Sequence, residues 1–197
     1  MERKSPSSCC QTPSIAAGIL TGGVALAAGW YLAQRVSVPA EVVPVEGFDV
    51  ERYLGHWYEI GRIDFFFEKG LTSCTADYSL NEDGTLAVFN QGFDPGNGSW
   101  KSARAVAKFV GDPSVASLKV SFFRPFYSGY HVVHVDEDYQ YAVVVGDGSK
   151  YCWVLSRSPE VNDKLYAGLL SVAAANGVDT SRMHRVPHGA MLEEAGE

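Results

Sequence analysis

The stretch TADYSLNEDGTLAVFNQGFDPGNGSWKSARAVAKFV, residues 75–110, contains three short runs of β-favouring residues separated by turn sequences. The runs cover Thr75–Leu80, Leu86–Phe93 and Ser99–Val110, and Asn81-Glu82-Asp83-Gly84 is the first turn. Alternation of apolar and polar residues over runs of this length is typical of half-buried strands. Asn, Asp, Gly and Pro between the runs mark hairpin turns. These residues therefore predict consecutive antiparallel hairpins.

Runs of the same kind continue on both sides of this stretch. One precedes it and four follow it: Trp57–Ile63, Ser117–Phe123, Tyr130–Asp136, Tyr141–Val145 and Tyr151–Ser156. Eight consecutive strands with short connections favour an up-and-down meander, and closure into a barrel removes both exposed edges. A closed barrel of eight strands has an interior that can hold one small ligand. We therefore expect an all-β fold, an eight-stranded up-and-down antiparallel β-barrel.

One helix is expected after the strands, packed on the outside of the barrel. Ser158 is a suitable N-cap, Pro159 suits the first helical position, and Asn176-Gly177 marks the C-terminal end. The expected apolar stripe consists of Val161, Leu165, Leu169 and Val172. A helix with a single apolar stripe buries it against a sheet, so this helix should cover part of the barrel wall.

Residues 15–33, IAAGILTGGVALAAGWYLA, carry no charge and follow Arg3 and Lys4. A run close to 20 apolar residues is long enough to cross a bilayer. We expect residues 1–36 to contain an N-terminal hydrophobic helix, which is either a cleaved signal sequence or a retained membrane anchor; a buried apolar helix is the alternative. Because the cations precede the run, the rest of the chain should be exported, membrane-associated, and face the periplasm or the extracellular side.

The same sequence patterns predict the domain boundaries. Residues 37–46 contain Pro39 and Pro44 without a sustained period, so they are expected to form a linker. The barrel domain should span residues 47–187, followed by a flexible tail over residues 188–197.

The composition excludes several functions. The chain has 16 Lys and Arg residues against 23 Asp and Glu residues, a net charge of −7, which disfavours nucleic acid as a partner. No nucleophile elbow, phosphate loop or dinucleotide fingerprint occurs, and His131 and His134 should point to opposite faces of a strand. Cys74 and Cys152 should also lie on opposite faces, which disfavours a disulfide. We expect no catalytic residue, metal site or cofactor.

Three stretches resemble the signature of the lipocalin family, in the family's order. They are Tyr53–Ile60 with a Gly-x-Trp motif, Asp138-Tyr139 before the seventh strand, and Leu155–Pro159 with an Arg at the end of the last strand. The resemblance runs from about Phe48 to Val186 and is greatest to the bacterial lipocalins of the outer-membrane lipoprotein type and to the apolipoprotein D group. In those lipoproteins the lipidated cysteine follows the hydrophobic run, whereas Cys9 and Cys10 precede it here.

The resemblance implies structural roles for the motif residues. Trp57 would plug the closed end of the barrel and Arg157 would stack on it, a cation–π contact. The structural motif residues are then Gly55, Trp57, Asp138, Tyr139 and Arg157. A ligand would enter at the other end, under the loop Asp64–Gly70 with its three consecutive Phe residues, which form an apolar lid or a membrane or partner contact, or simply fill the barrel mouth.

Strand alternation suggests which residues line the interior. Ala103, Ala105 and Phe109 share a face opposite Arg104 and Lys108, and small alanines on that face leave space. Amphipathic aromatic residues suit contact with an acyl chain. The expected ligand-binding residues are Tyr78, Ala103, Ala105, Phe109, Val120, Phe122, Tyr127 and Trp153; the alternative is that they only fill the barrel.

The resemblance implies a carrier that is not an enzyme. Its ligand would be a small hydrophobic molecule such as a fatty acid or lysophospholipid, and it would serve membrane lipid storage, transport or maintenance. A lipid- or isoprenoid-modifying enzyme of the wider superfamily is the alternative, and Cys74 is then the only inward thiol. A tetrapyrrole carrier would need an inward axial ligand, and none is evident. Homodimer formation is left open.

Overall fold

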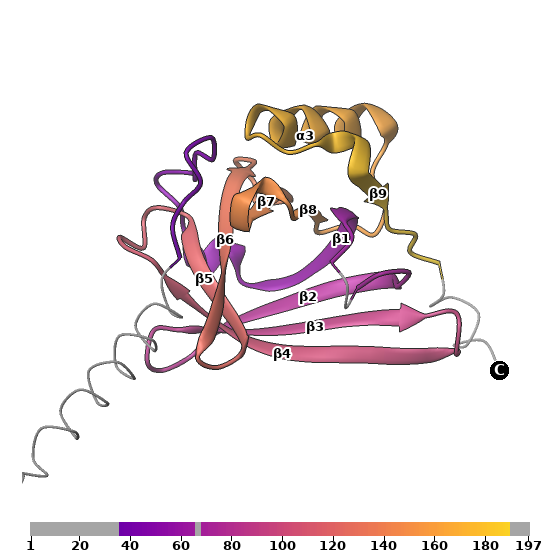
Figure 1. Cartoon of the computed structure of the whole chain (residues 1–197), viewed down its shortest axis with the longest axis horizontal. Coiled ribbons are helices and arrows are strands. Elements are labelled where there is room, and N and C mark those ends of the chain that lie inside the picture. The colour runs from indigo at the N-terminus through magenta and orange to yellow at the C-terminus, as the bar shows by residue number, and fades with distance from the viewer. Residues whose placement is uncertain (1–35, 66–67, 190–197) are drawn as a thin grey trace, which may run out of the picture.

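The computed structural model describes residues 36–65 and 68–189. It is a closed antiparallel β-barrel in which each strand pairs with the next, and β1 pairs with both β2 and β8 (Figure 1). Its strands are β1 (Gly55–Ile63), β2 (Thr72–Leu80), β3 (Leu86–Asp94), β4 (Ser99–Phe109), β5 (Ser117–Phe123), β6 (Phe126–Val135), β7 (Tyr141–Gly146) and β8 (Cys152–Ser156). The predicted eight-stranded up-and-down barrel is confirmed.

Several short elements were not predicted. A one-turn helix, α2 (Val50–Tyr53), precedes β1, and the 3-10 turn η1 (Asp147–Ser149) joins β7 to β8. Another 3-10 turn, η2 (Thr180–Arg182), leads into the short strand β9 (Met183–Arg185), which pairs with the end of β1. The hydrophobic helix expected within residues 1–36 falls almost wholly outside the described residues. No helix in residues 36–65 and 68–189 is long and apolar enough to cross a membrane.

The two ends of the barrel differ. At the closed end, α2 lies beside the start of β1, and Phe48 and Tyr53 pack into the barrel interior. The loops β1–β2, β3–β4, β5–β6 and β7–β8 gather at the other end, which we call the open end. The β2–β3 turn belongs to the closed end.

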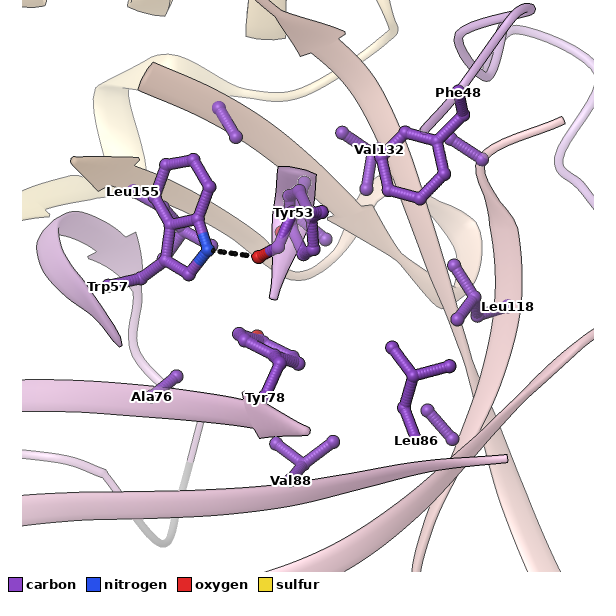
Figure 2. Close-up of a cluster of buried hydrophobic side chains, with 14 of the residues drawn as sticks. Phe48, Tyr53, Trp57, Ala76, Tyr78, Leu86, Val88, Leu118, Val132 and Leu155 are labelled. Carbon is purple, nitrogen blue, oxygen red and sulfur yellow. Dashed lines mark hydrogen bonds between the residues drawn. The ribbon is translucent and has the colours of Figure 1, made fainter. Parts of the chain in front are cut away.

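Strand alternation separates two apolar clusters. On β7, Ala142 and Val144 belong to an inner cluster inside the barrel, and Val143 and Val145 to an outer cluster beneath α3. Figure 2 shows the inner cluster around Trp57, whose indole Nε1 donates a 2.8 Å hydrogen bond to the Tyr53 carbonyl. The strand β7 therefore buries apolar side chains on both of its faces.

The helix α3 (Asp163–Ala175) packs outside the barrel as predicted, but it begins later than expected. The Asn162 side chain accepts a hydrogen bond from Leu165 N and caps the helix, so Ser158 and Pro159 lie in the preceding loop. The buried face consists of Tyr166, Leu169 and Ala173, and of these only Leu169 belongs to the predicted stripe. Val161 lies outside the helix, because the helix starts at Asp163. Leu165 and Val172 lie within it and are only partly buried.

The segment expected to be a linker, residues 37–46, packs on the barrel. Val42 is 4% exposed within the outer cluster, and Val43 N donates to Asn176 Oδ1 at the end of α3. Val45 N donates a backbone hydrogen bond to the Val132 carbonyl, and the Val45 carbonyl accepts one from Ala116 N. These residues are part of the folded domain.

A β-bulge corrects the prediction for the two histidines. Register pairs His131 with Val145 and His134 with Val143, and both valines belong to the outer cluster. The register shifts between Val132 and His134, so both histidines lie on the same outer face rather than on opposite faces. His131 is fully buried, and its Nδ1 atom lies 3.0 Å from the Ser117 hydroxyl. Within the described residues, no three potential ligands form a metal-binding group.

Candidate functional site

Arg157 ties the closed end together. Its Cζ atom lies 3.8 Å from the centre of the Trp57 ring, so the stacking implied by the resemblance is present. The same guanidinium donates to the backbone carbonyls of Arg52, Tyr53, Leu54, His56 and Tyr139. A planar group with five donors can satisfy several carbonyls at once. Arg157 therefore caps α2 as well as covering Trp57.

The other motif residues shape the same end. Gly55 has a φ of +90°, and a Cβ atom there would lie 3.6 Å from Arg157 Nη1. The Tyr139 hydroxyl accepts a hydrogen bond from Asp49 N, the N-cap of α2. Asp138 is exposed, and the neighbouring turn is held by Asp136, whose carboxylate accepts from the backbone nitrogens of Gln140 and Tyr141. These contacts fix the closed end of the barrel.

Three tyrosines form a buried chain of hydroxyls above this plug. The Tyr130 hydroxyl lies 2.7 Å from both the Tyr53 and the Tyr78 hydroxyls. Burial raises the pKa of all three groups, so they are neutral hydrogen-bonding groups at physiological pH. A cavity of about 10 Å³ lies beside them, lined by Phe48, Tyr53, Tyr78, Leu86, Ala107, Leu118, Val120 and Tyr130. This volume is about that of one water molecule, so the closed half is filled by side chains.

The open half contains a buried polar cluster built around Arg62. Its guanidinium donates to Glu59 Oε1 at 2.9 Å, to Asp64 Oδ1 at 2.9 Å and to Cys74 Sγ at 3.2 Å. It also donates to the carbonyls of Glu68 and Leu71 in the β1–β2 loop. Register pairs Glu59 with Leu155 of the inner cluster, and Arg62 with Trp153, which packs against that cluster. The cluster therefore lies on the interior face of the wall.

The acids around Arg62 outnumber the single cation. Glu59 is 8% exposed, and burial together with the charge of Glu68 raises its pKa to about 8. Burial also raises the pKa of Glu68, although a hydrogen bond from Trp153 Nε1 opposes this rise. Arg62 is shared among Glu59, Asp64 and three other acceptors, so it does not compensate fully for burial of the carboxyl groups.

Small side chains face the interior of the open half on β2, β3 and β4. Asn90 and Gly92 continue the inward alternation of Val88, and Ala103 lies opposite Asn90 on β4. A Cβ atom at Gly92 would lie 2.9 Å from Cys74 Sγ, so these two residues face each other inside the barrel. On this side, formed by β2, β3 and β4, the open half is thus lined by smaller groups than the closed half.

The structure brings together most of the predicted ligand-binding residues. Five belong to the inner cluster or pack against it: Tyr78, Ala105, Phe109, Val120 and Trp153. Ala103 is exposed and lies nearer the open end.

Two predicted residues lie elsewhere. Phe122 is 54% exposed at the β5–β6 turn, after a register shift between Val120 and Phe123. The Lys119 Nζ atom lies 4.9 Å from the centre of the Tyr127 ring, and Lys119 alternates with the inward residues Leu118 and Val120. Val120 pairs with Ser128, so the residue beside Ser128, Tyr127, has the opposite orientation. Tyr127 therefore lies on the outer face, contrary to its predicted place in the cavity.

The buried polar cluster around Arg62 was not predicted from the sequence. Glu59 lies two residues after Trp57, so alternation was a signal that it faces inward. Arg62 has the opposite phase from Trp57 in the sequence, and only the bulge between Glu59 and Gly61 turns it inward. Glu68 lies in a loop, where alternation gives no direction.

A second hollow lies outside the barrel. It has a volume of about 490 Å³, opens to solvent, and is lined by Ile60, Pro159, Glu160, Val161, Arg185, Val186, Pro187 and His188. The C-terminal segment forms one side of it, with Val186 N bonded to the Ile60 carbonyl. This groove is separated from the interior by β1 and is not the site predicted from the sequence.

Comparison with known proteins agrees with this architecture. The chain is 47% identical over 144 residues to the outer membrane lipoprotein Blc of Escherichia coli K12, covering 73% of this chain and 81% of that protein. It is 34% identical over 157 residues to temperature-induced lipocalin-1 of Arabidopsis thaliana, covering 75% and 83% of the two chains. Mouse apolipoprotein D is 31% identical over 145 residues, covering 70% and 76%.

Solved structures show the same fold at lower sequence identity. Insecticyanin of the tobacco hornworm Manduca sexta superposes with a TM-score of 0.62 at 18% identity, covering 78% of this chain and 87% of that one. The family model of the lipocalin-like domain matches residues 48–188. Together with the closed eight-stranded barrel and the Trp57–Arg157 contact, these matches show that the chain belongs to the lipocalin family.

Proposed function

We propose that this lipocalin is a carrier that holds a single-chain amphiphile, a fatty acid or a lysophospholipid, in the open half of its barrel. The observation that carries this proposal is the graded lining of the interior. The small side chain of Ala103 lies on the inward face towards the open end, whereas Tyr53, Tyr78 and Tyr130 fill the closed half. An apolar chain inserted from the open end would meet a floor of tyrosines.

Apolar walls supply the binding free energy in this proposal. Val88, Ala105 and Leu155 belong to the inner cluster, and Trp153 packs against it beside Glu68. Burial of each methylene contributes about 0.8 kcal/mol, and micromolar binding requires about 8 kcal/mol. An acyl chain of twelve or more carbons can therefore reach this affinity after ordering costs.

The properties of Cys74 favour a carrier over an enzyme. Burial raises the pKa of its thiol to about 12, and Glu59 adds to this effect. A nucleophilic cysteine reacts as the thiolate, which is scarce at neutral pH in such a site. Among the inward residues in the part of the chain that the structure describes, the enzyme alternative therefore has no activated thiol.

We also propose that the carrier works at a membrane, serving lipid storage, transport or maintenance. The apolar run at residues 15–33 would attach it on the periplasmic or extracellular side. The name of the relative in Escherichia coli, an outer membrane lipoprotein, is consistent with an exported and membrane-associated protein.

Two measurements test the carrier proposal. Native mass spectrometry of the purified chain should detect a co-purified amphiphile of one acyl chain. Fluorescence titration with a lysophospholipid should give saturable binding at micromolar or lower concentration. Absence of saturable binding to the parent chain, for lysophospholipids and for fatty acids, would refute the proposal.

A matched pair of variants locates the ligand. Ala103→Trp places a large side chain on the interior face of the open half, and affinity should fall at least tenfold. Ser102→Trp adds the same side chain to the other face of β4 and should leave affinity unchanged, since neighbouring strand residues point to opposite faces. Equal affinities of the two variants would place the ligand outside the barrel interior.

A further inference from the structure

The β5–β6 turn exposes three aromatic side chains. Phe122, Phe123 and Phe126 are 54%, 77% and 63% exposed, and we call these three residues the aromatic turn. Phe123 and Phe126 are paired across the hairpin, and the exposed Arg124 lies between them in the chain. Large apolar groups gathered at one tip are costly to leave in water and mark a contact surface.

The described chain begins beside this hairpin. A Cβ atom on Gly129 would lie 3.3 Å from Val36 Cγ1, so the Val36 side chain packs against the β6 backbone. Gly129 lies three residues from Phe126 on the same strand, about 10 Å at 3.3 Å per residue. The point where the N-terminal segment meets the barrel is therefore close to the aromatic turn.

The sequence leaves little chain between the barrel and the apolar run. That run ends at Ala33, three residues before Val36, and three residues span at most about 11 Å. If residues 15–33 are embedded in a bilayer, the aromatic turn lies within about 20 Å of the membrane surface.

We propose that the aromatic turn is a membrane-contact surface that inserts at the boundary between the headgroups and the acyl chains of the bilayer holding the N-terminal segment. This inference rests on the membrane attachment given under the proposed function. Aromatic residues favour the membrane–water interface, and Arg124 is positioned to meet lipid phosphates. Because the turn belongs to the open end, its insertion directs the barrel mouth towards the lipid.

A second copy of the chain fits the turn less well. Stable protein interfaces bury about 800 Å² per partner and involve 20 to 30 residues on each side. The aromatic turn offers three large apolar side chains at the tip of a single hairpin. A bilayer accepts a narrow apolar tip without a complementary partner surface.

Photo-crosslinking of the full-length chain tests the proposal. The protein is reconstituted into vesicles of phosphatidylethanolamine and phosphatidylglycerol that contain a phospholipid with a diazirine in its acyl chain. After irradiation, lipid adducts are mapped by tandem mass spectrometry. We expect adducts on residues 15–33 and on residues 122–126. Leu80 and Val110, which are 47% and 42% exposed at the closed end, should carry none.

A matched pair of variants tests whether the adducts depend on the aromatic turn itself or on any exposed apolar side chain. The double variant Phe123→Ser/Phe126→Ser should lower adduct formation on the turn at least fivefold and leave that on residues 15–33 unchanged. Leu80→Ser should change neither. Near-ultraviolet circular dichroism checks that each variant keeps the parent fold, which we expect because the replaced side chains are exposed.

Each result decides between separate claims. Adducts on residues 15–33 without adducts on the turn would overturn the membrane-contact surface and leave the anchor intact. Dimers of the parent chain in native mass spectrometry that the double variant does not form, together with absence of lipid adducts on the turn, would assign the surface to a second copy. Absence of adducts at both regions would overturn the attachment on which the inference rests, while the carrier proposal is decided independently by lipid titration.

Discussion

The guanidinium of Arg157 lies over the Trp57 ring, 3.8 Å from its centre, and at the same time donates to carbonyls of α2 and of the turn before β7. Trp57 is fully buried, so this contact closes the end of the barrel against water. Arg157 thus joins β1, the short helix α2 before it and the end of β8. The Arg157 side chain therefore covers the Trp57 plug and caps α2 at the same time.

Replacement of Arg157 should destabilise the barrel. Arg157→Ala removes the cation over Trp57 and leaves several carbonyls without their donor, and we expect a loss of about 2–4 kcal/mol in the free energy of unfolding. Urea denaturation followed by fluorescence measures the loss. The affinity of the remaining folded protein for lysophospholipid should stay within about twofold, because Arg157 lies at the end opposite the mouth.

Arg157→Lys is the matched control for this prediction. Lysine keeps the positive charge but not the planar fork, so it should recover only part of the lost stability. A lysine variant as stable as the parent would show that charge alone matters at this position. An alanine variant as stable as the parent would remove the structural role altogether.

The tyrosine chain gives a second prediction. Tyr130→Phe removes the hydroxyl that bonds both Tyr53 and Tyr78, with an expected cost of about 2–3 kcal/mol. Tyr78→Phe removes an end of the chain and should cost about 1 kcal/mol, since Tyr130 keeps its bond to Tyr53. Thermal or chemical denaturation compares the two variants. Equal losses would mean that these hydroxyls find other partners.

The sequence predicted best where a regular period or a local motif determines the structure. Turn residues and alternating strands gave the eight-stranded barrel, and the motifs containing Trp57 and Arg157 gave the closed end. Prediction failed where the period breaks. The bulge after Glu59 turns Arg62 inward, and the bulge near His134 brings both histidines to one face. Bulges depend on pairing between distant strands, and single-strand alternation does not reveal them.

Residues 37–46 illustrate a different failure. Their buried contacts come singly, at Val42 in the outer cluster and at Val45 between β5 and β6, so no periodic face exists in the sequence. The partners of these residues lie far along the chain, for example Asn176. A segment that fills gaps left by other elements therefore resembles a linker when its sequence is considered alone.

This packing makes a third prediction. Val42→Ala should lower the free energy of unfolding by about 1–2 kcal/mol, because Val42 is 4% exposed against the outer cluster. Val43→Ala, one residue later and 71% exposed, should change it by less than about 0.5 kcal/mol. Equal values for the two variants in chemical denaturation would indicate that the segment is not held on the barrel in solution.

The buried acids of the open half make the last prediction, which concerns pH. Burial and the neighbouring Glu68 raise the pKa of Glu59 from its ordinary value of 4.5 to about 8. In that interval the folded chain binds a proton at Glu59 that the unfolded chain has released. Stability contributed by this proton is fully present below pH 4.5 and is lost as the pH rises through 8.

Glu59→Gln isolates this effect, because glutamine keeps a carbonyl oxygen for Arg62 and does not titrate. The free energy of unfolding of the variant, minus that of the parent, should rise by about 1–3 kcal/mol between pH 5 and pH 8. Burial lowers the pKa of His131 and His188 and gives both proteins a contribution of opposite sign, which cancels in the difference. A difference that is flat from pH 5 to pH 8 would mean that Arg62 keeps Glu59 ionised in the folded barrel despite its burial.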